Sequence, residues 1–586
     1  MVALIKSATL VGIDAVTIDV ECVITSGQLP AFNIVGLPTT SVKEGAVRIR
    51  SALHSVGHDV PQKKVTVNLA PADLRKPGSA LDLPTALSIV IADGTFDGSL
   101  LDSLLVLGEL GLDGSVRAVP GVLAAAMLAR KRRMRGILVP DRCAAEALVV
   151  DGIEVYGVRH LSQVIAALAG EEELPQPSSA SGRPRNRIFS ADMSDVRGQD
   201  FARAAIEIAV AGGHNLLMTG PPGTGKTMLA RRIPSVLPTM TRDEALETTK
   251  IYSALGLADG GLITERPFRA PHHTISGAAL HGGGTMPRPG EISLAHNGVL
   301  FLDELPEFAR YTIEALRQPL EERAVTVSRI NGMIRLPSSF MLVAASNPCP
   351  CGWLQSGVRE CTCSRFAVER YRARMSGPLL DRIDLQVYVR PVELKVLRDP
   401  KPSESSSRVR DRVMLARERQ LARLSRFGIR CNAEMPPKVL RETCPLDDAC
   451  ETYLKELVEV RQSLSARSID RLIKVARTIA DILGQDRIDR VCLREAADYR
   501  AIDPTADIFA APPPHASGRP LIARVRMNDE TATVIVDSDD DGYEPWAPPP
   551  ERESTDAEPP QVGHPEPTPD DLAAATHSLP PLPPPP

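Results

Sequence analysis

The alternation of apolar and polar positions in residues 1–165 predicts a first domain built of both strands and helices. Strands are expected at 15–22 and 64–69, where β-branched residues dominate, and a helix is expected at 41–56. The apolar positions of that helix include Val47, Ile49 and Leu53. Strands and helices mixed in this way favour an α+β domain.

Three continuous apolar runs, at 215–218, 298–302 and 340–345, stand out in the central region from about 195 to 393. Continuous apolar runs of this length suit parallel strands that are buried on both faces of a sheet. Polar residues follow each run at once. Because open α/β sheets bind ligands at the carboxyl ends of their strands, a ligand site is expected there.

The remaining regions are a linker, a helical region and a tail. Residues 166–194 include a stretch rich in Pro, Ser and Gly, which indicates a linker. Residues 394–510 carry Leu, Arg, Glu and Ala at helical spacing, which predicts a helical lid. Residues 511–586 combine clustered prolines with an acidic run and cannot bury a core, so this tail is expected to be disordered.

The first apolar run leads into a glycine-rich octapeptide that fits the P-loop pattern G-x-x-x-x-G-K-[ST]. Strand, glycine loop and helix together direct backbone N–H groups at a polyphosphate. Lys226 is expected to reach the outer phosphates, and the Thr227 hydroxyl is expected to bind Mg²⁺. The expected cofactors are therefore ATP and Mg²⁺. The predicted nucleotide-binding residues are Gly220, Pro221, Pro222, Gly223, Thr224, Gly225, Lys226 and Thr227.

The second and third runs supply polar groups that complete a site for ATP hydrolysis. Asp303 and Glu304 follow the second run. Asp303 is expected to hold Mg²⁺ through water, and Glu304 to polarise the water that attacks the γ-phosphate. Asn347 follows the third run and is placed to hold that water. Further on, Arg382 and Arg467 offer cationic groups, although an isolated arginine is more often a surface charge.

Composition limits the kinds of partner. The 586 residues carry a net charge of −5, so any contact with nucleic acid must be local. The sequence shows no signal segment and no apolar stretch of membrane-spanning length, and a membrane is not an expected partner. Ten cysteines in a chain of this length do not form the dense framework of small secreted domains. A reducing cytoplasm is the expected setting.

These motifs, in this order, resemble those of AAA+ ATPases. Four longer stretches narrow the resemblance to the magnesium-chelatase-like competence protein ComM (YifB) family, and the likeness extends from the first residues to about position 508. They are Phe268-Arg269-Ala270-Pro271-His272-His273, the segment 289–298, Asn347-Pro348-Cys349-Pro350-Cys351-Gly352 and Ala476-Arg477-Thr478-Ile479-Ala480-Asp481. The implied fold class is α/β: an AAA+ P-loop core with a helical lid, preceded by an α+β Lon-protease-like (S5 domain 2-like) domain.

The resemblance also implies roles and partners. Asn347 would be sensor 1, Arg382 the arginine finger that reaches a neighbouring subunit's ATP, and Arg467 sensor 2. An arginine that acts on a neighbour requires a homo-oligomer, and the family implies a hexameric ring. It further implies a DNA motor, a helicase that promotes branch migration while single-stranded DNA is integrated during transformation. A hairpin at 324–336, with Asn331-Gly332 at its turn, would project into the ring pore and contact single-stranded or branched DNA.

The first domain also resembles the Lon-type protease fold, at 78–80 and 108–117. Lon-like enzymes use a serine activated by a lysine. Ser79 lies near the serine position, but the segment 117–130 that should supply the lysine contains none. We therefore expect a non-proteolytic module. Its basic cluster, Arg130 to Arg133 with Arg135, is either a phosphate contact or a solvated helix end.

Cys349, Cys351, Cys361 and Cys363 form two close pairs in the insertion 349–363 of the ATPase core. Four thiolates suit tetrahedral Zn²⁺, although one residue between paired cysteines is tighter than the usual two to four. Structural zinc and free thiols remain open alternatives at this point. For His272 and His273, hydrogen bonding to the backbone is expected rather than metal binding. The insertion's Arg365, Arg370, Arg372 and Arg374 are either pore or interface contacts.

Two other functions share much of this pattern. The chain could be the ATPase subunit of a magnesium–porphyrin chelatase, or an ATP-dependent Lon-like protease. The missing lysine argues against the protease, and a Lon-like first domain is not expected in the chelatase subunit. Stimulation of ATP turnover by DNA would separate the DNA motor from both.

Overall fold

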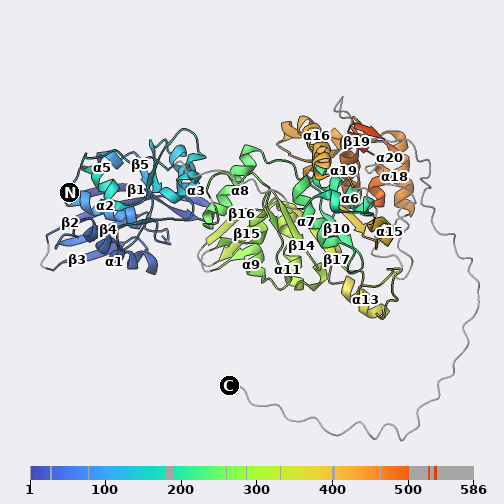
Figure 1. Cartoon of the computed structure of the whole chain (residues 1–586), viewed down its shortest axis with the longest axis horizontal. Helices are drawn as coiled ribbons and strands as arrows, with labels where there is room; N and C mark the ends of the chain where they lie inside the picture. Colours follow the sequence, from blue (N-terminus) through green and yellow to red (C-terminus); the bar gives the residue numbers. More distant parts are fainter. Residues whose placement is uncertain are drawn as a thin grey trace, which may run out of the picture. The chain divides into compact units, whose positions relative to one another are not determined.

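The computed structural model describes most of the chain up to residue 500 (Figure 1). The described residues are 2–26, 29–76, 78–178, 191–258, 260–284, 287–329, 332–398, 403–460, 464–500, 525–527 and 534–536. The predicted disordered tail therefore lies outside them, apart from β19 (Val525–Met527) and β20 (Val534–Val536), which pair antiparallel. For these two strands the prediction of disorder is wrong, because Val and Ile favour strands even in a segment that builds no core.

The first domain begins with a mixed four-stranded sheet in the order β1-β2-β4-β3. Strands β1 and β2 pair antiparallel, as do β2 and β4, whereas β3 and β4 are parallel. The predicted strands at 15–22 and 64–69 lie within β2 and β4. The bounds of these elements are β1 (Val2–Val11), β2 (Asp14–Thr25), β3 (Ala31–Val35), β4 (Lys64–Ala70), α1 (Thr40–Ser55) and α2 (Asp82–Ala92).

Helix α1 occupies the predicted position, but one of its apolar residues faces the other way. Ile49 and Leu53 are buried, with exposed fractions of 1% and 0%, whereas Val47 is 66% exposed. Residues four apart share a helix face, and residues two apart lie on nearly opposite sides. The buried face of α1 therefore contains Ile49 and Leu53, and Val47, two residues from Ile49, lies on the exposed side.

A second, parallel sheet in the order β5-β8-β9 completes this domain. Its central strand β8 is buried at every position. The bounds are β5 (Leu104–Val106), β6 (Glu109–Leu110), β7 (Val116–Arg117), α3 (Val122–Lys131), β8 (Gly136–Pro140), α4 (Ala144–Leu148), β9 (Glu154–Val158) and α5 (Leu161–Leu168). The domain thus combines mixed and parallel sheets with helices, which confirms the predicted α+β class.

The central region contains a parallel five-stranded sheet in the order β11-β14-β17-β10-β18. The three apolar runs become its three central strands, β14, β17 and β10. Their side chains are almost all buried, as expected for strands covered on both faces. The bounds are β10 (Leu216–Thr219), β11 (Phe268–Arg269), β14 (Val299–Leu302), β17 (Met341–Ser346) and β18 (Leu385–Tyr388).

Each face of this sheet has its own hydrophobic core. On one face Met218 and Val343 pack in a cluster that also contains Val475 of the helical lid. On the other face Leu300 and Leu342 belong to a separate cluster. Helix α6 (Asp200–Gly212) precedes the first strand of the sheet, β10. The helices between the strands are α7 (Lys226–Val236), α8 (Arg242–Ala254), α9 (Gly277–His281), α10 (Glu291–Leu294), α11 (Arg310–Glu314), α12 (Arg317–Glu322), α13 (Arg365–Arg372) and α14 (Gly377–Leu380).

Two hairpins interrupt the chain between strands of the central sheet. The larger one pairs β15 (Ala324–Arg329) with β16 (Gly332–Pro337), in the register that brings Arg329 opposite Gly332. This confirms the predicted hairpin, although Asn331 at its turn lies outside the described residues. The smaller one pairs β12 (Gly282–Gly283) with β13 (Arg288–Pro289).

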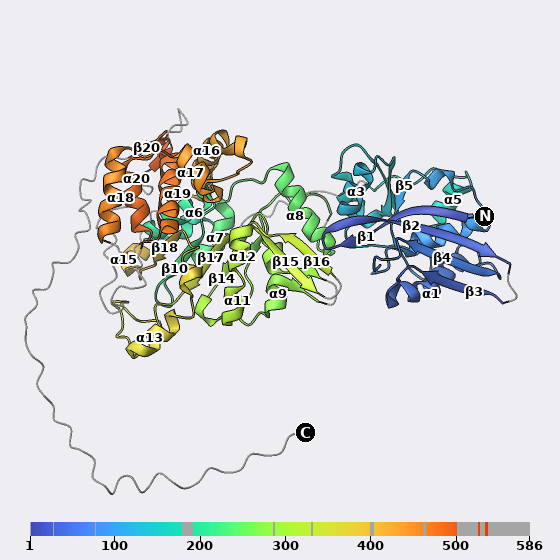
Figure 2. The same cartoon turned by 180° about the vertical axis from the view of Figure 1, so that it is seen from behind.

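The predicted helical lid follows the sheet, and Figures 1 and 2 both show its helices gathered beside α6. The lid and the core are joined by a buried ion pair. Arg412, with 1% of its side chain exposed, donates to both carboxylate oxygens of Glu207 at 2.7 and 2.8 Å. The bounds are α15 (Leu394–Leu397), α16 (Ser406–Leu424), α17 (Pro437–Thr443), α18 (Asp448–Val460), α19 (Ala466–Leu483) and α20 (Arg490–Asp498).

Among the described helices, none combines the length and apolar character needed to cross a bilayer.

Candidate functional site

The glycine-rich loop after β10 has the backbone that a phosphate cradle requires. Gly223 and Gly225 adopt φ values of +78° and +90°, in the left-handed region that favours glycine. A Cβ at Gly220 would collide with the carbonyl oxygen of Val389, so only glycine fits there. Helix α7 begins directly after this loop, at Lys226. The loop and the helix N-terminus therefore direct N–H groups to one place, which is a favourable site for an anion.

The amine of Lys226 is hydrogen-bonded to the backbone of this loop. Its Nζ donates to the carbonyl oxygens of Gly220 at 2.7 Å and Pro221 at 2.9 Å, and to Oδ1 of Asn347 at 3.3 Å. Burial lowers the pKa of Lys226 to about 8, although the carboxylates of Asp303 and Glu304 oppose the shift. The structure thus brings Asn347, from the end of β17, to the same point as the P-loop lysine.

Two hard oxygen ligands meet at the carboxyl ends of β10 and β14. The hydroxyl of Thr227 donates to Oδ2 of Asp303 at 2.7 Å, and the backbone N–H of Glu304 donates to Oδ1 of Asp303 at 3.0 Å. Hydroxyl and carboxylate oxygens are the ligands that Mg²⁺ prefers. The two residues therefore fit a magnesium ion bound beside the phosphates.

Glu304 lies at the mouth of this site in an unusual conformation. Its φ is +53°, which is uncommon for a residue with a side chain and is often found where function constrains the backbone. About half of its side chain is exposed, and Nδ1 of His273 lies 3.6 Å from its Oε2. The carboxylate is therefore accessible to water and close to a second titratable group.

His273 is a residue that sequence reasoning missed. The rings of His272 and His273 lie 4.1 Å apart with 34° between their planes. His272 accepts a hydrogen bond from the backbone of Thr274, as expected. His273 instead faces Glu304. The signals in the sequence were that His273 ends the stretch 268–273, which carries part of the resemblance, and that it lies four residues after β11, the strand paired with β14.

Arg382 and Arg467 lie together, away from the loop of their own chain. Arg382 pairs with Glu321 and also donates to the carbonyl oxygen of Pro378 at 2.5 Å. Arg467 approaches the same Glu321 carboxylate at 3.8 Å, with 74% of its side chain exposed. Asn215, which precedes β10, donates to the backbone carbonyl of Arg382. The arginines thus lie at the amino end of β10, and the P-loop lies at its carboxyl end, about 13 Å along the strand.

The four cysteines of the insertion also converge. Their sulfur atoms all lie within 4.8 Å of one another, and one of them, Cys349, is fully buried. Two of these cysteines lie at each end of the segment 349–363, so the folded loop brings both pairs to one place, as a shared metal site would need.

In the first domain, the Ser79 hydroxyl donates to the Glu109 carboxylate. Lys76, three residues before it, donates instead to the carbonyl oxygens of Gly36 and Pro71. A nucleophilic serine needs a base that accepts its proton, and a lysine amine bonded to carbonyls does not fill that role for Ser79. The arrangement supports the non-proteolytic interpretation of this domain. The cluster Arg130 to Arg133 is exposed at the end of α3.

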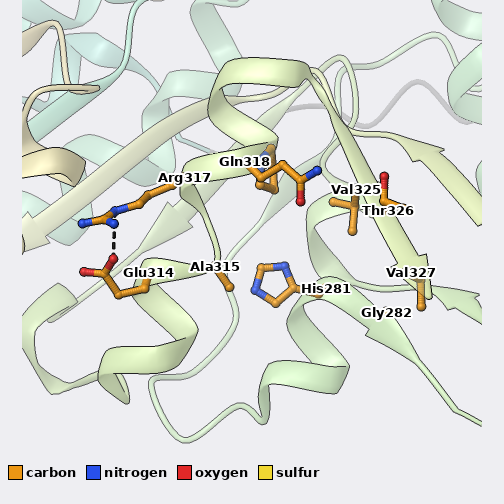
Figure 3. A pocket seen from close by; sticks show the side chains of 10 residues that line it. His281, Gly282, Glu314, Ala315, Arg317, Gln318, Val325, Thr326 and Val327 are labelled. Atoms are coloured by element: carbon orange, nitrogen blue, oxygen red, sulfur yellow. Dashed lines mark ion pairs between the residues drawn. The ribbon is translucent and has the colours of Figure 1, made fainter. Parts of the chain in front are cut away.

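A cavity of about 350 Å³ lies at the base of the larger hairpin, separate from the P-loop. It is lined by residues of α9, α11, α12 and β15. Figure 3 shows His281, Gln318 and Val325 around it, with the Glu314–Arg317 ion pair (2.8 Å) at one side. Strand β15 of the hairpin therefore borders a cavity that both polar and apolar side chains line.

The lowered pKa of Lys226 predicts how ATP affinity depends on pH. Above pH 8 the free lysine loses its proton, whereas bound phosphates raise its pKa and require it charged. ATP affinity should therefore fall about tenfold per pH unit above pH 8. Titration with a fluorescent nucleotide between about pH 7 and pH 9.5 measures this. Lys226→Arg is the matched control, because a guanidinium stays charged throughout. A flat profile for the unmodified chain would contradict the assignment.

Comparison with protein families agrees with this geometry. The protein family described as "Magnesium chelatase, subunit ChlI" matches residues 192–397, which contain the sheet and the P-loop. "Subunit ChlI of Mg-chelatase" matches residues 20–142 in the first domain, and "Magnesium chelatase, subunit ChlI C-terminal" matches residues 403–500 in the lid.

Individual proteins are similar over most of the chain. YifB of Escherichia coli is 43% identical over 503 residues, which cover 86% of this chain and 97% of YifB. Competence protein ComM of Haemophilus influenzae is 42% identical over 511 residues, 85% of this chain and 97% of ComM. Lon protease 2 of Bacillus subtilis is 26% identical over 203 residues, 30% of this chain and 35% of the protease.

Proposed function

Because the chain belongs to the YifB/ComM family of magnesium-chelatase-like AAA+ ATPases, we propose that it is an ATP-driven ring motor that acts on DNA. Its specific task in this proposal is helicase activity that promotes branch migration and integrates single-stranded DNA during natural transformation and recombination. The observation that carries the proposal is the combination of a complete ATP site with a hairpin inserted between the strands that bear Asp303 and Asn347.

The ATP step uses the groups gathered at the strand ends. The P-loop N–H groups and Lys226 bind the phosphates, and Thr227 with Asp303 would hold Mg²⁺, which neutralises charge on the phosphates when bound. Glu304 accepts a proton from the attacking water, and Asn347 positions that water beside the γ-phosphate. All of these groups lie within one chain.

The remaining cationic group comes from a neighbouring subunit in this proposal. Arg382 and Arg467 share Glu321 at the amino end of the sheet, whereas the P-loop lies at the carboxyl end. These arginines are separated from the P-loop of their own chain by the length of β10, about 13 Å. A closed ring, for which we propose a hexamer, lets each chain present both arginines to the next chain's ATP.

The DNA-binding part of the proposal rests on the larger hairpin. Its turn lies between β15 and β16, and Arg335 on β16 is exposed. The net charge of −5 leaves no broad basic surface, so a few arginines at a pore would have to make the phosphate contacts. A relative bears the name competence protein, which agrees with the proposed role in natural transformation.

Arg335→Ala is expected to weaken DNA binding uniformly across sequences and to lower the salt dependence of binding by about one charge. Fluorescence anisotropy with labelled single strands at several salt concentrations measures both. Arg426→Ala is the matched control, because Arg426 is an exposed lid arginine paired with Glu442. Equal effects of the two substitutions would contradict a hairpin contact.

A second candidate function is the ATPase subunit of a magnesium-chelatase-type complex. The argument that the first domain is foreign to such a subunit does not hold, because a family described as a subunit of Mg-chelatase matches residues 20–142. Proteolysis remains a weaker candidate, since Ser79 is bonded to Glu109. The experiment must therefore show whether the energy of ATP hydrolysis is used on DNA or on a chelatase partner subunit.

The deciding experiment is strand exchange on a synthetic four-way junction, with ATP turnover measured in the same tubes. The DNA motor predicts ATP-dependent resolution of the junction and turnover stimulated by branched or single-stranded DNA. Lys226→Ala should lose both activities. Turnover indifferent to every DNA tested, with no junction movement, would overturn the proposal in favour of the chelatase subunit. Cleavage of casein that depends on Ser79 would instead establish the protease.

A further inference from the structure

The four sulfur atoms of the insertion have the spacing of ligands around one metal ion. The distances between sulfur atoms are 3.4 Å from Cys349 to Cys351, 3.7 Å from Cys349 to Cys361 and 3.6 Å from Cys351 to Cys361. Four thiolates about 2.3 Å from a central zinc lie about 3.8 Å from one another. A disulfide instead needs sulfur atoms about 2.05 Å apart, and all ten cysteines are free. The observed spacing therefore matches a shared ion better than a bond.

The backbone around the cluster is arranged as it is around metal-bound thiolates. The N–H of Leu354 donates to the sulfur of Cys349, and the N–H of Cys351 donates to the sulfur of Cys363, both at 3.4 Å. Donors of this kind orient thiolate ligands and offset part of their charge. Two separate turns of the insertion thus already point N–H groups at sulfur.

The insertion has too little apolar contact to hold its shape without such an ion. Its hydrophobic cluster contains only Cys349, Leu354 and Val368 as buried members. From Pro348 to Ser364 the described chain forms neither helix nor strand. Small segments without a sufficient core usually need a metal or a disulfide to fold, and metal binding then contributes directly to folding.

We propose that Cys349, Cys351, Cys361 and Cys363 bind one structural Zn²⁺ as thiolates, and that this ion fixes the loop between Asn347 and α13 against the P-loop. The four thiols lose their protons when the ion binds, and no oxidation or reduction is involved. The spacing of one residue within each pair still lets all four sulfur atoms lie within 4.8 Å of one another.

The loop that this zinc would fix contacts the P-loop and two neighbouring elements of the core, β18 and α13. A Cβ on Gly352 would lie 2.7 Å from the ring of Pro222, so the loop packs closely against the P-loop. The Tyr388 hydroxyl, at the end of β18, donates to the carbonyl oxygen of Leu354 at 3.4 Å. Arg372 of α13 donates to the carbonyl oxygen of Pro348 at 3.4 Å. Only this positioning role depends on the proposed ATPase function; zinc binding itself does not.

Metal analysis of the purified full-length chain tests the site directly. After expression with added zinc and removal of loosely bound metal, about one zinc per chain is expected. Cys361→Ser with Cys363→Ser should reduce this to about a tenth or less. Cys444→Ala is the matched control, because that buried lid cysteine lies outside the cluster, and it should keep its zinc. Absence of zinc from the unmodified chain, or its retention in the double variant, would overturn the proposal.

Two further measurements keep the test independent of activity and of folding failure. Cobalt bound in place of zinc should give the strong visible absorption of tetrahedral thiolate coordination, which the double variant should lack. Hydrogen exchange should become faster in residues 349–364 when zinc is removed by a chelator, while exchange in the lid stays unchanged. Cobalt spectra without thiolate character would contradict the ligand set. Unchanged exchange in the loop would contradict its positioning role, whatever the chain does with ATP or DNA.

Discussion

Glu304→Gln is expected to bind ATP with about the affinity of the unmodified chain and to hydrolyse it at least about a hundredfold more slowly. The amide has nearly the same shape as the carboxylate but cannot accept a proton from water. Glu304 is half-exposed at the mouth of the site, and the hydrogen bonds described above for Lys226 and Thr227 go to other groups, so the phosphate cradle should remain intact. Steady-state turnover and nucleotide titration on the same preparation measure the two effects separately.

Glu307→Gln is the matched control for this substitution. Glu307 is also a half-exposed carboxylate on the same loop, but it pairs with Arg374 at 3.1 Å. Its loss should leave turnover within about a factor of three of the unmodified rate. Equal losses at Glu304 and Glu307 would show that the loop matters as a structure, and would remove Glu304 from its role as the base.

Arg382→Ala is expected to lower ATP turnover by about a thousandfold or more, while ATP still binds. The guanidinium would neutralise charge at the transition state in a neighbouring site, and alanine offers no such group. The fold should survive, because the contacts to Asn215 and Arg471 use the backbone carbonyl of Arg382 and not its side chain. Arg365→Ala is the control, since Arg365 is an exposed arginine paired with Glu369 on α13.

Mixing two inactive variants tests whether this arginine acts between chains. A ring assembled from Arg382→Ala and Glu304→Gln chains contains sites with an intact Glu304 beside a neighbour with an intact Arg382. Mixed rings should therefore regain a measurable part of the turnover that each variant lacks alone. No recovery in rings shown to contain both chains, or full turnover by an Arg382→Ala chain that remains monomeric, would contradict action between subunits.

The sequence was most informative where a function depends on neighbouring residues of one segment. The P-loop fits its pattern at every defined position, and the apolar runs before Asp303 and Asn347 became adjacent strands because buried strands need apolar residues at nearly every position. The class of each domain followed from the same periodicity, and the larger hairpin from its Asn-Gly turn.

Contacts between distant segments could not be predicted in this way. His273 reaches Glu304, and Glu321 collects Arg382 and Arg467, only because the sheet order brings separate stretches together. His273 belongs to the stretch 268–273 that carries part of the resemblance, but that stretch does not indicate its partner, and Glu321 belongs to no motif named above. The cluster of cysteines is an intermediate case: the sequence supplied the right residue types, but only the folded loop showed that four sulfur atoms meet at one point.

The buried Arg412–Glu207 pair has a mechanical consequence. An ion pair with both partners removed from water is costly to separate, and here it joins lid and core where they already share apolar packing. The helical lid and the ATPase core of one chain should then move together as one rigid body. In an assembled ring, the movement that follows ATP hydrolysis would then have to occur at the interfaces between protomers. The rigidity of each protomer would set how far hydrolysis in one protomer displaces its neighbour.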